Sequence, residues 1–500
     1  MYAIGFDVGS QSLKGVLLDA TGAAVAQAAA SYDVHYPHPA WAEQDPLDWR
    51  RAMASVVGRL LAAGGIRPDA VATIGLASQV DGLVAVDDAA EPLHPAIIWL
   101  DRRASLQTRR LSKDLDPSAI RRLTGLNLDA SHVAPKIMWL REHHPDVYER
   151  AAGLLLPGSA HVAWMTRERA LDHANASSTL LYDVTTQGWS SEMLAAAELV
   201  AARLGDIRPA AEIIGELRPA AAQALGLTTA TTVVTGTGDE HGASLGAGGI
   251  APGIVIDITG TAEPVCVAAL SPVIDETGLM ETHGHADPRV WLVENPGFVS
   301  GGSVTWFRSA MGGGSAADLD AEAAATTAPG AEGVTFLPTL SGATAPRWND
   351  EARGVFAGLS LNHGRGHLYR AVLEGCTFAL RDIVDRLDAM GLAGDEIRVV
   401  GGGARSPFWL QMKADVTRRT VRVLAHDEAT AMGAGMLAAV GAGFVRDLDE
   451  AVERCVRVDA RAYAPDRSAQ AAYDDAYGRY RRLFDAVEPT FGAGHPGGVG

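Results

Sequence analysis

The sequence contains very little cysteine. Its 500 residues include only three, Cys266, Cys376 and Cys455, which stand far apart. An odd number of widely spaced cysteines matches neither a disulfide framework nor a zinc-ligand pattern. We therefore expect three free thiols and a reducing, cytoplasmic environment.

Long hydrophobic runs are also missing. The N-terminus reaches Asp7 without a basic stretch followed by an apolar one, so it lacks the pattern of a signal peptide. No apolar run approaches the roughly 18–20 residues that are needed to cross a bilayer. We expect a protein that is soluble and has no membrane partner.

Basic residues are outnumbered by acidic ones. The chain has 42 lysines and arginines against 60 aspartates and glutamates, which gives a net charge of −18. Such an excess argues against a protein that binds nucleic acid or anionic membranes through its overall charge. A local basic pocket could still hold a phosphate group.

Apolar residues, in contrast, are plentiful. The composition is 47% hydrophobic and 20% charged, which is ordinary for a globular protein and excludes disorder along the whole chain. At about 100–200 residues per domain, the length predicts two or three domains.

The first ninety residues alternate between strand and helix patterns. Apolar runs at 3–6, 14–19 and 23–30 are separated by turn residues, which predicts an antiparallel meander of three strands. Asp45-Pro46 then predicts the start of a helix that ends at Gly64-Gly65. Strand patterns return at 71–76 and 83–86. This alternation indicates an α/β architecture.

The opening pattern occurs again in the middle of the chain. An apolar strand runs into Asp7 and a turn, and another runs into Asp257 and the turn Thr259-Gly260-Thr261. The two aspartates stand 250 positions apart, half the length of the chain. We interpret the repeat as a structural duplication, with two similar domains facing each other across a cleft. The alternative is a chance similarity between two hairpins.

The first hairpin is a candidate phosphate site. Gly9 allows the backbone to approach a ligand closely, Ser10 and Ser12 add hydroxyls, and successive N–H groups in such turns bind anions. Asp7 would hold a divalent cation through water, and Lys14 could reach a terminal phosphate. The alternatives are a plain β-turn and a solvated lysine.

Two further glycine-containing turns extend this pattern. Thr259, Gly260 and Thr261 offer the same groups from the second half, so the two hairpins could grip a polyphosphate from both sides. Gly401, Gly402 and Gly403 lie between a strand and a helix, where backbone can lie flat against a planar or phosphorylated ligand. Neither a dinucleotide fingerprint nor a P-loop is present.

Asp239 is the candidate catalytic residue. It follows the glycine-rich stretch 235–238 and begins a helix whose Gly242 and Gly246 allow close packing. A carboxylate on such a rigid first turn can orient a hydroxyl or accept its proton. The alternative is a helix-capping aspartate.

His283 and His285 stand two positions apart on a predicted strand, so their side chains share one face. That spacing occurs in metal sites, but no third ligand lies nearby in the sequence. We favour a structural role over metal binding.

Taken together, these motifs resemble the FGGY carbohydrate kinases, particularly the xylulokinase-like branch. The opening 5–14 resembles the family's first phosphate hairpin, and 41–46 its usual lead into the first helix. Segment 134–140 matches the first family signature, 354–374 fits the second, and 401–411 is similar to the adenosine-binding motif. The resemblance runs from residue 1 to about 485.

The resemblance implies an actin/hexokinase-like fold, with two ribonuclease-H-like domains closing over ATP, Mg²⁺ and a sugar. It implies a sugar-side domain at 1–247 with Asp239 as the catalytic carboxylate, a nucleotide-side domain at 248–485, and a flexible tail at 486–500. It also suggests a homodimer. Asp7 would serve Mg²⁺, and the nucleotide would contact Gly9, Ser10, Gln11, Ser12, Lys14, Thr259, Gly260, Thr261, Gly401, Gly402, Gly403, Ala404 and Arg405.

The expected sugar-side residues are Gln79, Val80, Asp81, Asp101 and Glu240. Xylulokinases usually carry histidine where Asp81 stands. An ionised aspartate only accepts hydrogen bonds and can take two adjacent hydroxyls, whereas histidine also donates. This departure could change the substrate, so a ketopentose or another polyol is expected and xylulose itself is open. For Asp101, an ion pair with a neighbouring arginine is an equal alternative.

Two rival functions share the predicted fold. One is an ATPase whose two-domain clamp drives conformational change, and the other is a non-catalytic sugar sensor. The second family signature argues against the ATPase, and the presence of Asp239 with both hairpins argues against the sensor.

Overall fold

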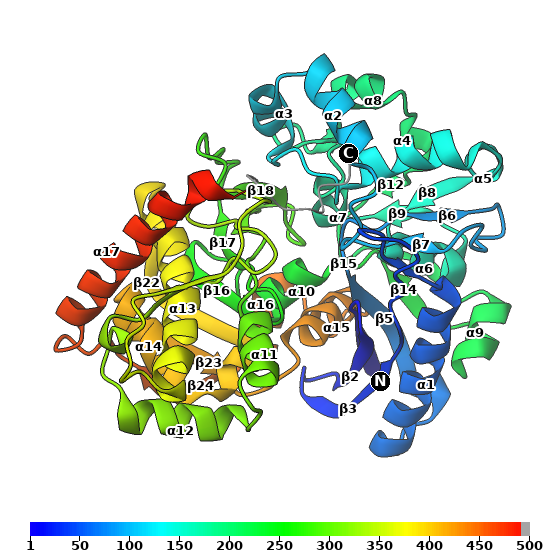
Figure 1. The fold of residues 1–500 in the computed structure, drawn as a ribbon. Helices are drawn as coiled ribbons and strands as arrows, with labels where there is room; N and C mark the ends of the chain where they lie inside the picture. The colour runs from blue at the N-terminus through cyan, green and yellow to red at the C-terminus, as the bar shows by residue number, and fades with distance from the viewer. Residues whose placement is uncertain (492–500) are drawn as a thin grey trace.

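A computed structural model describes residues 1–491 of the chain. Two α/β halves lie side by side, each built on a seven-stranded sheet (Figure 1). The N-terminal sheet consists, in spatial order, of β13 (Ile213–Glu216), β14 (Thr232–Val234), β5 (Val71–Ser78), β1 (Tyr2–Val8), β2 (Ser12–Asp19) and β3 (Ala24–Ser31), with β15 (Thr237–Gly238) beside β5.

The C-terminal sheet has a matching order. Its strands are β24 (Val458–Tyr463), β23 (Thr420–Leu424), β22 (Ala393–Gly401), β16 (Gly253–Thr259), β17 (Val265–Ala269), β19 (Trp291–Asn295) and β18 (Glu281–Gly284).

The two sheets show that the halves are duplicates. Strand β1 pairs antiparallel with β2 and parallel with β5, and β16 pairs in the same way with β17 and β22. The correspondence extends outward to β3 and β19, to β14 and β23, and to the antiparallel edge strands β13 and β24. The predicted meander, duplication and α/β fold are therefore confirmed.

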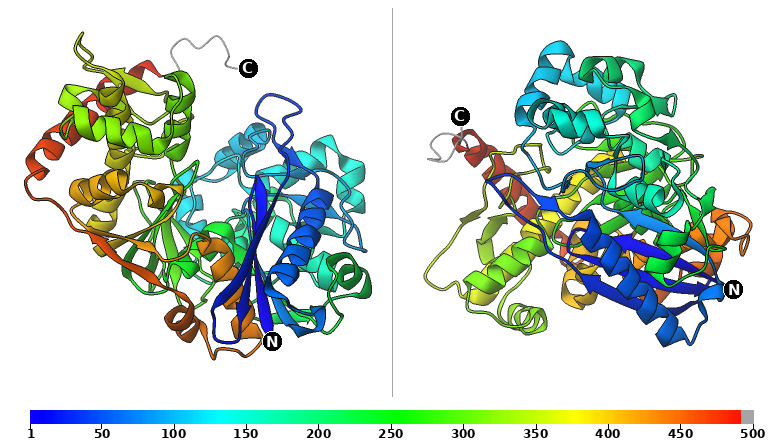
Figure 2. Two further views of the ribbon diagram at one scale, coloured as in Figure 1. Left: turned by 90° about the horizontal axis from the view of Figure 1, so that it is seen from below. Right: turned by 90° about the vertical axis from the view of Figure 1, so that its right-hand side faces the viewer.

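Helix α1 (Pro46–Gly64) forms where the sequence predicts it. The Asp45 side chain accepts a hydrogen bond from the N–H of Leu47, Pro46 occupies the first turn, and Gly65 ends the helix in a left-handed conformation (φ 62°). Its buried face, which includes Trp49 and Leu60, covers β2 and β3 (Figure 2).

A helical subdomain grows out of the N-terminal half. It has its own apolar core, in which Trp139 and Tyr182 are buried. Its elements and the adjoining ones are β4 (Glu43–Gln44), β6 (Val84–Val86), β7 (Ala96–Ile97), α2 (Ser105–Asp114), α3 (Pro117–Thr124), α4 (Val133–His143), α5 (Pro145–Arg150), β8 (Gly153–Leu155), α6 (Pro157–Thr166), β9 (Ala170–Leu171), α7 (His173–Ser177), β10 (Tyr182–Asp183), β11 (Gly188–Trp189), α8 (Ser191–Ala197), β12 (Asp206–Ile207) and α9 (Pro219–Leu225).

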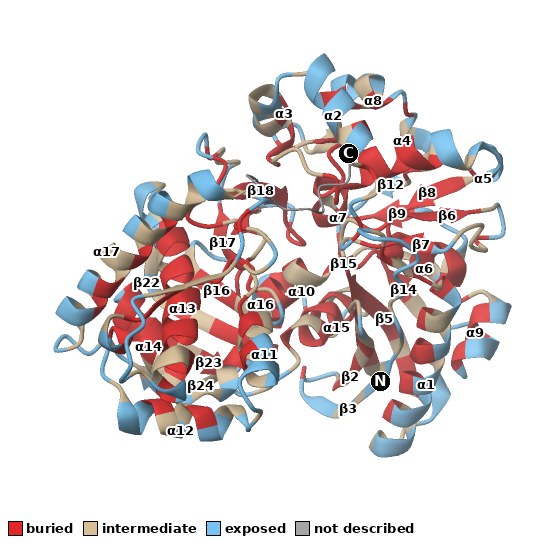
Figure 3. Ribbon diagram, in the orientation of Figure 1, coloured by how far each residue is buried: buried red, intermediate tan, exposed pale blue. Residues whose placement is uncertain are grey.

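The C-terminal half is built around one long buried helix, α13 (Arg365–Ala389), whose burial is visible in Figure 3. The other elements of this half are α11 (Gly301–Ala310), α12 (Ala316–Thr326), β20 (Thr335–Leu337), β21 (Val355–Ala357), α14 (Pro407–Thr417), α16 (Leu448–Cys455) and α17 (Gln470–Val487).

The chain end differs in part from the expected tail at 486–500. Helix α17 continues to Val487, and Phe491 packs against the core of the C-terminal half. The regular structure therefore extends past residue 485, because Val487 and Phe491 both pack against the apolar core. The glycine-rich end of the sequence gives no sign of these contacts. Residues 492–500 lie outside the described residues.

Two helices join the halves. Helix α10 (Asp239–Gly246) packs against α15 (Ala429–Gly441), which in turn lies on β1 and β5 (Figure 1). A Cβ on Gly246 would lie 1.9 Å from the Ala429 carbonyl oxygen, and one on Gly433 would lie 2.0 Å from that of Gly242. The backbones therefore touch, as the small residues of 242–247 predict.

All three cysteines are free and buried, as expected. Among residues 1–491, no helix has the length and apolar character needed to cross a membrane.

The contact between α10 and α15 generates a prediction about stability. Gly433→Ala should lower the free energy of unfolding by at least about 2 kcal/mol, because the new methyl group forces two backbones apart. Gly58→Ala in α1 is the matched control, since nothing lies within 4 Å of its added Cβ. The control should be neutral or stabilise by up to about 1 kcal/mol. Urea unfolding of both variants measures the difference, and equal stabilities would contradict the packing.

Candidate active site

Side chains from neighbouring elements hydrogen-bond the backbone of the first hairpin. The N–H of Gly9 donates to the Ser12 carbonyl at 3.2 Å, and the Tyr32 hydroxyl donates to the Gly9 carbonyl. The amide of Gln44 donates to the Ser10 carbonyl at 2.7 Å. Tyr32 follows β3 and Gln44 lies in β4, so two neighbouring elements fix the shape of the turn between β1 and β2.

Asp7 lies at the end of β1, opposite Lys14 in the hairpin register. Burial, together with the charge of Asp239, raises the pKa of Asp7 to about 7. Lys14 forms an ion pair with Glu428 at 2.9 Å, just before α15 begins. Asp7 therefore lies close to the catalytic candidate and beside the junction of the two halves.

Asp239 is the first residue of α10. Its carboxylate accepts a hydrogen bond from the N–H of Glu240 at 3.1 Å. Burial raises the pKa of Asp239 to about 6, and the charge of Asp81 adds to the rise. Residues 79–82, which follow β5 and are called the sugar loop below, lie against the start of α10, where a Cβ on Gly238 would lie 2.6 Å from Val80 Cγ1.

The sugar loop is also connected to the phosphate hairpin. The Gln79 side-chain amide donates to the side-chain oxygen Oε1 of Gln44 at 2.8 Å. Because the Gln44 amide donates to the Ser10 carbonyl, Gln44 links Gln79 to the hairpin. The Gln79 Oε1 atom is buried and has no hydrogen-bond partner among the described residues. It is an acceptor available for a bound hydroxyl.

Two other predicted sugar-side residues have protein partners. Asp101 is completely buried, where its carboxylate binds the Arg103 guanidinium at 2.7 Å and the N–H of Ala42 at 2.6 Å. This geometry fits the structural ion pair that the sequence offered as an alternative. Glu240 lies near Glu294 of β19, and its pKa is raised well above the usual range by burial and by the charge of Glu294.

The second hairpin, whose turn is 259–261, and the glycine cluster 401–403 lie against each other. Strands β16 and β22 pair so that Thr259 is opposite Gly401. A Cβ on Gly401 would lie 2.7 Å from the Thr259 carbonyl oxygen, and one on Gly403 would lie 2.6 Å from the Thr259 Cβ. These glycines therefore permit the close approach of the two turns.

The Thr259 hydroxyl faces inward. Its side chain is buried and donates to Asp257 at 2.7 Å, while Lys413 of α14 donates to it at 2.7 Å. Contact between Thr259 and a nucleotide could therefore come only from its backbone. Gly260 and Thr261 are exposed at the turn, where Gly301 of α11 lies against the Gly260 carbonyl.

Lys413 forms the centre of a fully buried ion network below the second hairpin. Its ammonium group binds Asp257 at 2.5 Å and Glu263 at 3.0 Å, and none of the three side chains is exposed. Burial, with the charge of Asp257, raises the pKa of Glu263 to about 8. The network ties α14 to both strands of the hairpin.

The glycine cluster and the first hairpin face a common space. Arg405, which follows the cluster and pairs with Asp427 at 3.1 Å, is close enough to Lys14 for its charge to act on the lysine pKa. One phosphate-binding candidate from each half, Lys14 and Arg405, therefore lies near the junction of the halves.

The His283 and His285 side chains do share one face, where both lie near His241 with ring centroids 5.6 and 6.5 Å away. His283 pairs with Glu294 at 3.1 Å. Within residues 1–491, no group of three histidine, cysteine or acidic side chains is arranged to hold a metal ion. The preference for a structural role of this pair over metal binding stays a prediction.

Several residues of the site were not singled out from the sequence: Tyr32, Gln44, Lys413 and Glu428, together with His132 and Lys136, which both contact Asp81. Each acts through a partner that is distant along the chain, so no local pattern reveals it. Gln44 and Lys136 do fall inside family motifs, which was the only available signal.

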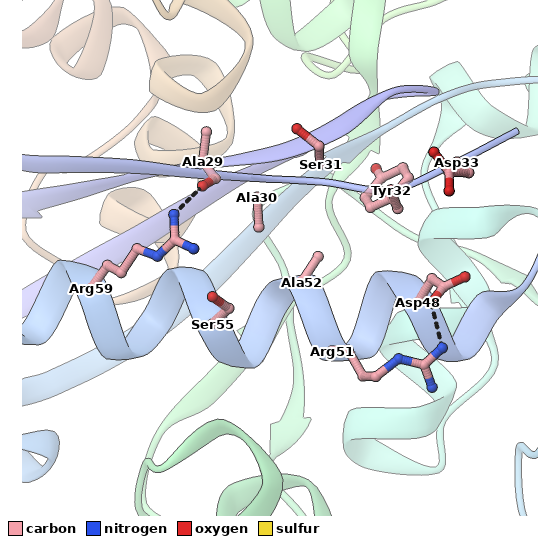
Figure 4. Close-up of a pocket in the computed structure, with 10 residues that line it drawn as sticks. All are labelled: Ala29, Ala30, Ser31, Tyr32, Asp33, Asp48, Arg51, Ala52, Ser55 and Arg59. Carbon is pink, nitrogen blue, oxygen red and sulfur yellow. Dashed lines mark hydrogen bonds and ion pairs between the residues drawn. The ribbon is translucent and has the colours of Figure 1, made fainter.

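A separate pocket of about 630 Å³ lies between β3 and α1 (Figure 4). Arg59 donates to the Ala29 carbonyl there, and Arg51 pairs with Asp48. None of the site residues predicted from the sequence lines this pocket.

Comparisons with known proteins agree with this geometry. The family model for the N-terminal domain of the FGGY family of carbohydrate kinases matches residues 2–246, and the model for the C-terminal domain matches residues 257–442. A xylulose kinase from Escherichia coli is 31% identical over 97% of this chain and 99% of its own. A glycerol kinase from Limosilactobacillus reuteri is 29% identical over 90% of this chain and 91% of its own.

Among solved structures, a gluconate kinase from Lactobacillus acidophilus superposes with a TM-score of 0.90. It is 25% identical, and the match covers 98% of this chain and 99% of that one. The chain is thus similar along its length to kinases that carry three different substrate names.

The ion network below the second hairpin generates a prediction. Lys413→Met should destabilise the fold by about 3–5 kcal/mol, because it leaves the Asp257 carboxylate buried without a cation. The triple variant Lys413→Met, Asp257→Asn, Glu263→Gln should recover much of that loss, since no charge remains buried. Denaturant unfolding tests both variants. A triple variant less stable than the single one would contradict the assignment.

Proposed function

Because the chain belongs to the FGGY family of carbohydrate kinases, we propose that it transfers the γ-phosphoryl group of ATP to a hydroxyl of a neutral sugar or polyol, with a ketopentose such as xylulose as the leading candidate. The position of Asp239 carries this proposal. Its carboxylate accepts a hydrogen bond from the N–H of Glu240 and lies near both Asp81 of the sugar loop and Asp7.

In the proposed reaction, Asp239 orients the acceptor hydroxyl and takes its proton as the new bond to phosphorus forms. Phosphoryl transfer passes through a loose transition state, so positioning and charge neutralisation supply most of the catalysis. The N–H donor of Glu240 orients the carboxylate without neutralising it. Approach of the two halves would exclude water from the reacting groups.

The nucleotide phosphates would lie between the turn at 9–12 and the turn at 259–261, with the adenosine against 401–405. Asp7 fits a Mg²⁺ ion because its half-buried carboxylate lies near that of Asp239, which leaves negative charge without a full counter-ion. Magnesium bound to phosphates needs only one or two carboxylates, and it would neutralise charge on the phosphoryl oxygens.

The relatives differ from one another in their substrates. At 25–31% identity, their names include xylulose, glycerol and gluconate. The carboxylates of Asp81 and Asp239 beside the acceptor position favour a neutral polyhydroxy compound over an acid sugar. Another pentulose or a polyol is the alternative. A cytoplasmic location and a homodimer remain predictions.

Replacing the catalytic carboxylate should abolish most of the activity. We expect Asp239→Asn to lower kcat by about 100- to 10,000-fold, because the amide cannot accept the proton. Its melting temperature should equal or exceed that of the wild type, since an ionisable carboxyl with a raised pKa is removed from a buried position. Sugar-dependent ADP release measures the activity, and Asp116→Asn, at an exposed helix cap of α3, is the control. Retained turnover would overturn the assignment.

Activity should also depend on pH through Asp239. Its pKa of about 6 means that the carboxylate is ionised, and able to accept a proton, only above that pH. We expect kcat/KM to be constant from about pH 8 to about pH 7 and to fall roughly tenfold per unit below pH 6. Initial rates at saturating Mg²⁺ test this, and a profile that stays flat to about pH 5 would contradict it.

A further inference from the structure

Asp81 is held in place at three points. Its backbone has the left-handed conformation (φ 59°), which few residues other than glycine adopt. The buried ammonium group of Lys136 donates to the Asp81 carbonyl at 2.6 Å and to the Ile98 carbonyl at 2.9 Å. The third point is the carboxylate, whose Oδ1 lies 3.3 Å from Nδ1 of His132.

His132 lies immediately before α4, and its ring is almost completely enclosed by acceptors. Nδ1 is 2.9 Å from the Ser178 carbonyl oxygen, and Nε2 is 3.1 Å from that of Asn127. Carbonyl oxygens only accept hydrogen bonds, so both ring nitrogens must carry hydrogen and the ring is an imidazolium ion. Burial lowers the pKa of His132, but the charge and hydrogen bond of Asp81, together with the charges of Glu281 and Asp129, outweigh it and raise the pKa to about 9.

The arrangement leaves His132 unable to contact a substrate. Its side chain is 6% exposed, whereas that of Asp81 is 14% exposed. Because His132 engages one oxygen of the carboxylate, the other oxygen is available to the space beside Asp239, whose pKa the Asp81 charge raises. The cation is thus positioned to fix Asp81 as an ionised acceptor at the sugar site.

The other charges around the pair do not change this conclusion. Asp129 and Glu281 also face His132 and favour its charged form. Arg102 pairs with Asp129 at 3.6 Å. The Lys136 ammonium group donates hydrogen bonds to two backbone carbonyls. Asp81 and Asp239 together present carboxylates to the acceptor molecule.

We propose that His132 is a positioning residue that sets substrate specificity by holding Asp81 as a fixed carboxylate. The pair selects neutral substrates that offer two adjacent hydroxyls and rejects aldonates, in which a carboxylate would face like charge. This inference rests on the proposed sugar kinase function and names the substrate class for it.

A double-mutant cycle tests the proposal. Rates are measured with the wild type, Asp81→Asn, His132→Gln and the double variant, using xylulose as a neutral ketopentose and gluconate as an aldonate. Asp81→Asn should lower kcat/KM for xylulose by about 10- to 100-fold and shift the xylulose-to-gluconate ratio toward gluconate by at least about tenfold. His132→Gln should lower kcat/KM for xylulose about tenfold when Asp81 is present. In the Asp81→Asn background it should lower kcat/KM less than about twofold.

Independent, multiplicative losses in the double variant would show that His132 has a merely structural role, and an unchanged substrate ratio in Asp81→Asn would show that Asp81 does not select by charge. Either result overturns the inference. His143→Gln on α4 is the matched control and should leave both rates unchanged. If His132→Gln melts more than about 10 °C below the wild type, His132→Asn replaces it in the cycle.

The wild-type rates separate this inference from the proposed function. A wild-type chain that phosphorylates gluconate but no neutral sugar or polyol would contradict the inference and leave a carbohydrate kinase. A chain that releases ADP with neither class of substrate would contradict the proposed function itself.

Discussion

The position of the proposed catalytic residue depends on one contact, the backbone-to-backbone packing of α10 against α15. Gly246 and Gly433 bring the two helices so close that a Cβ on either would collide with a carbonyl oxygen of the other helix, and a Cβ on Gly242 would lie 2.6 Å from the Cβ of Ala77 in β5. Helix α15 in turn rests on Gly5 of β1 and Gly75 of β5 through similar contacts. Asp239 begins α10, Asp7 ends β1, and the sugar loop follows β5. One tightly packed unit thus fixes the catalytic carboxylate relative to both predicted substrates.

Negative charge is the second organising feature of the site. Burial and mutual repulsion raise the pKa values of Asp7 and Asp239 to about 7 and about 6, and that of Glu240 is raised further. Carboxylates gathered in this way are unfavourable in the free protein and become favourable when cations and hydroxyl donors arrive. The arrangement therefore suits a magnesium–nucleotide complex beside a neutral polyhydroxy molecule. The cations that the protein itself provides, at Lys14 and His132, are already paired.

The sequence allowed the local features to be predicted well. The hairpin at Asp7, the cap of α1, the start of α10 and the duplication of the sheet all follow from patterns of a few neighbouring residues. The close packing at Gly242 and Gly246 was also predicted, because small residues at helical spacing have few other uses. What could not be predicted are contacts between distant residues: Lys413 with Asp257, His132 with Asp81, and Gln44 with Gln79. For the same reason, the inward direction of the Thr259 hydroxyl and the burial of Asp101 became apparent only in three dimensions.

The most direct test of the central claim is a crystal structure with a non-hydrolysable ATP analogue and Mg²⁺. The account predicts that the terminal phosphate lies between the turns at 9–12 and 259–261, with the metal ion beside Asp7 and the adenine against 401–404. A nucleotide bound in the pocket between β3 and α1, or phosphates that contact only one of the two turns, would contradict it.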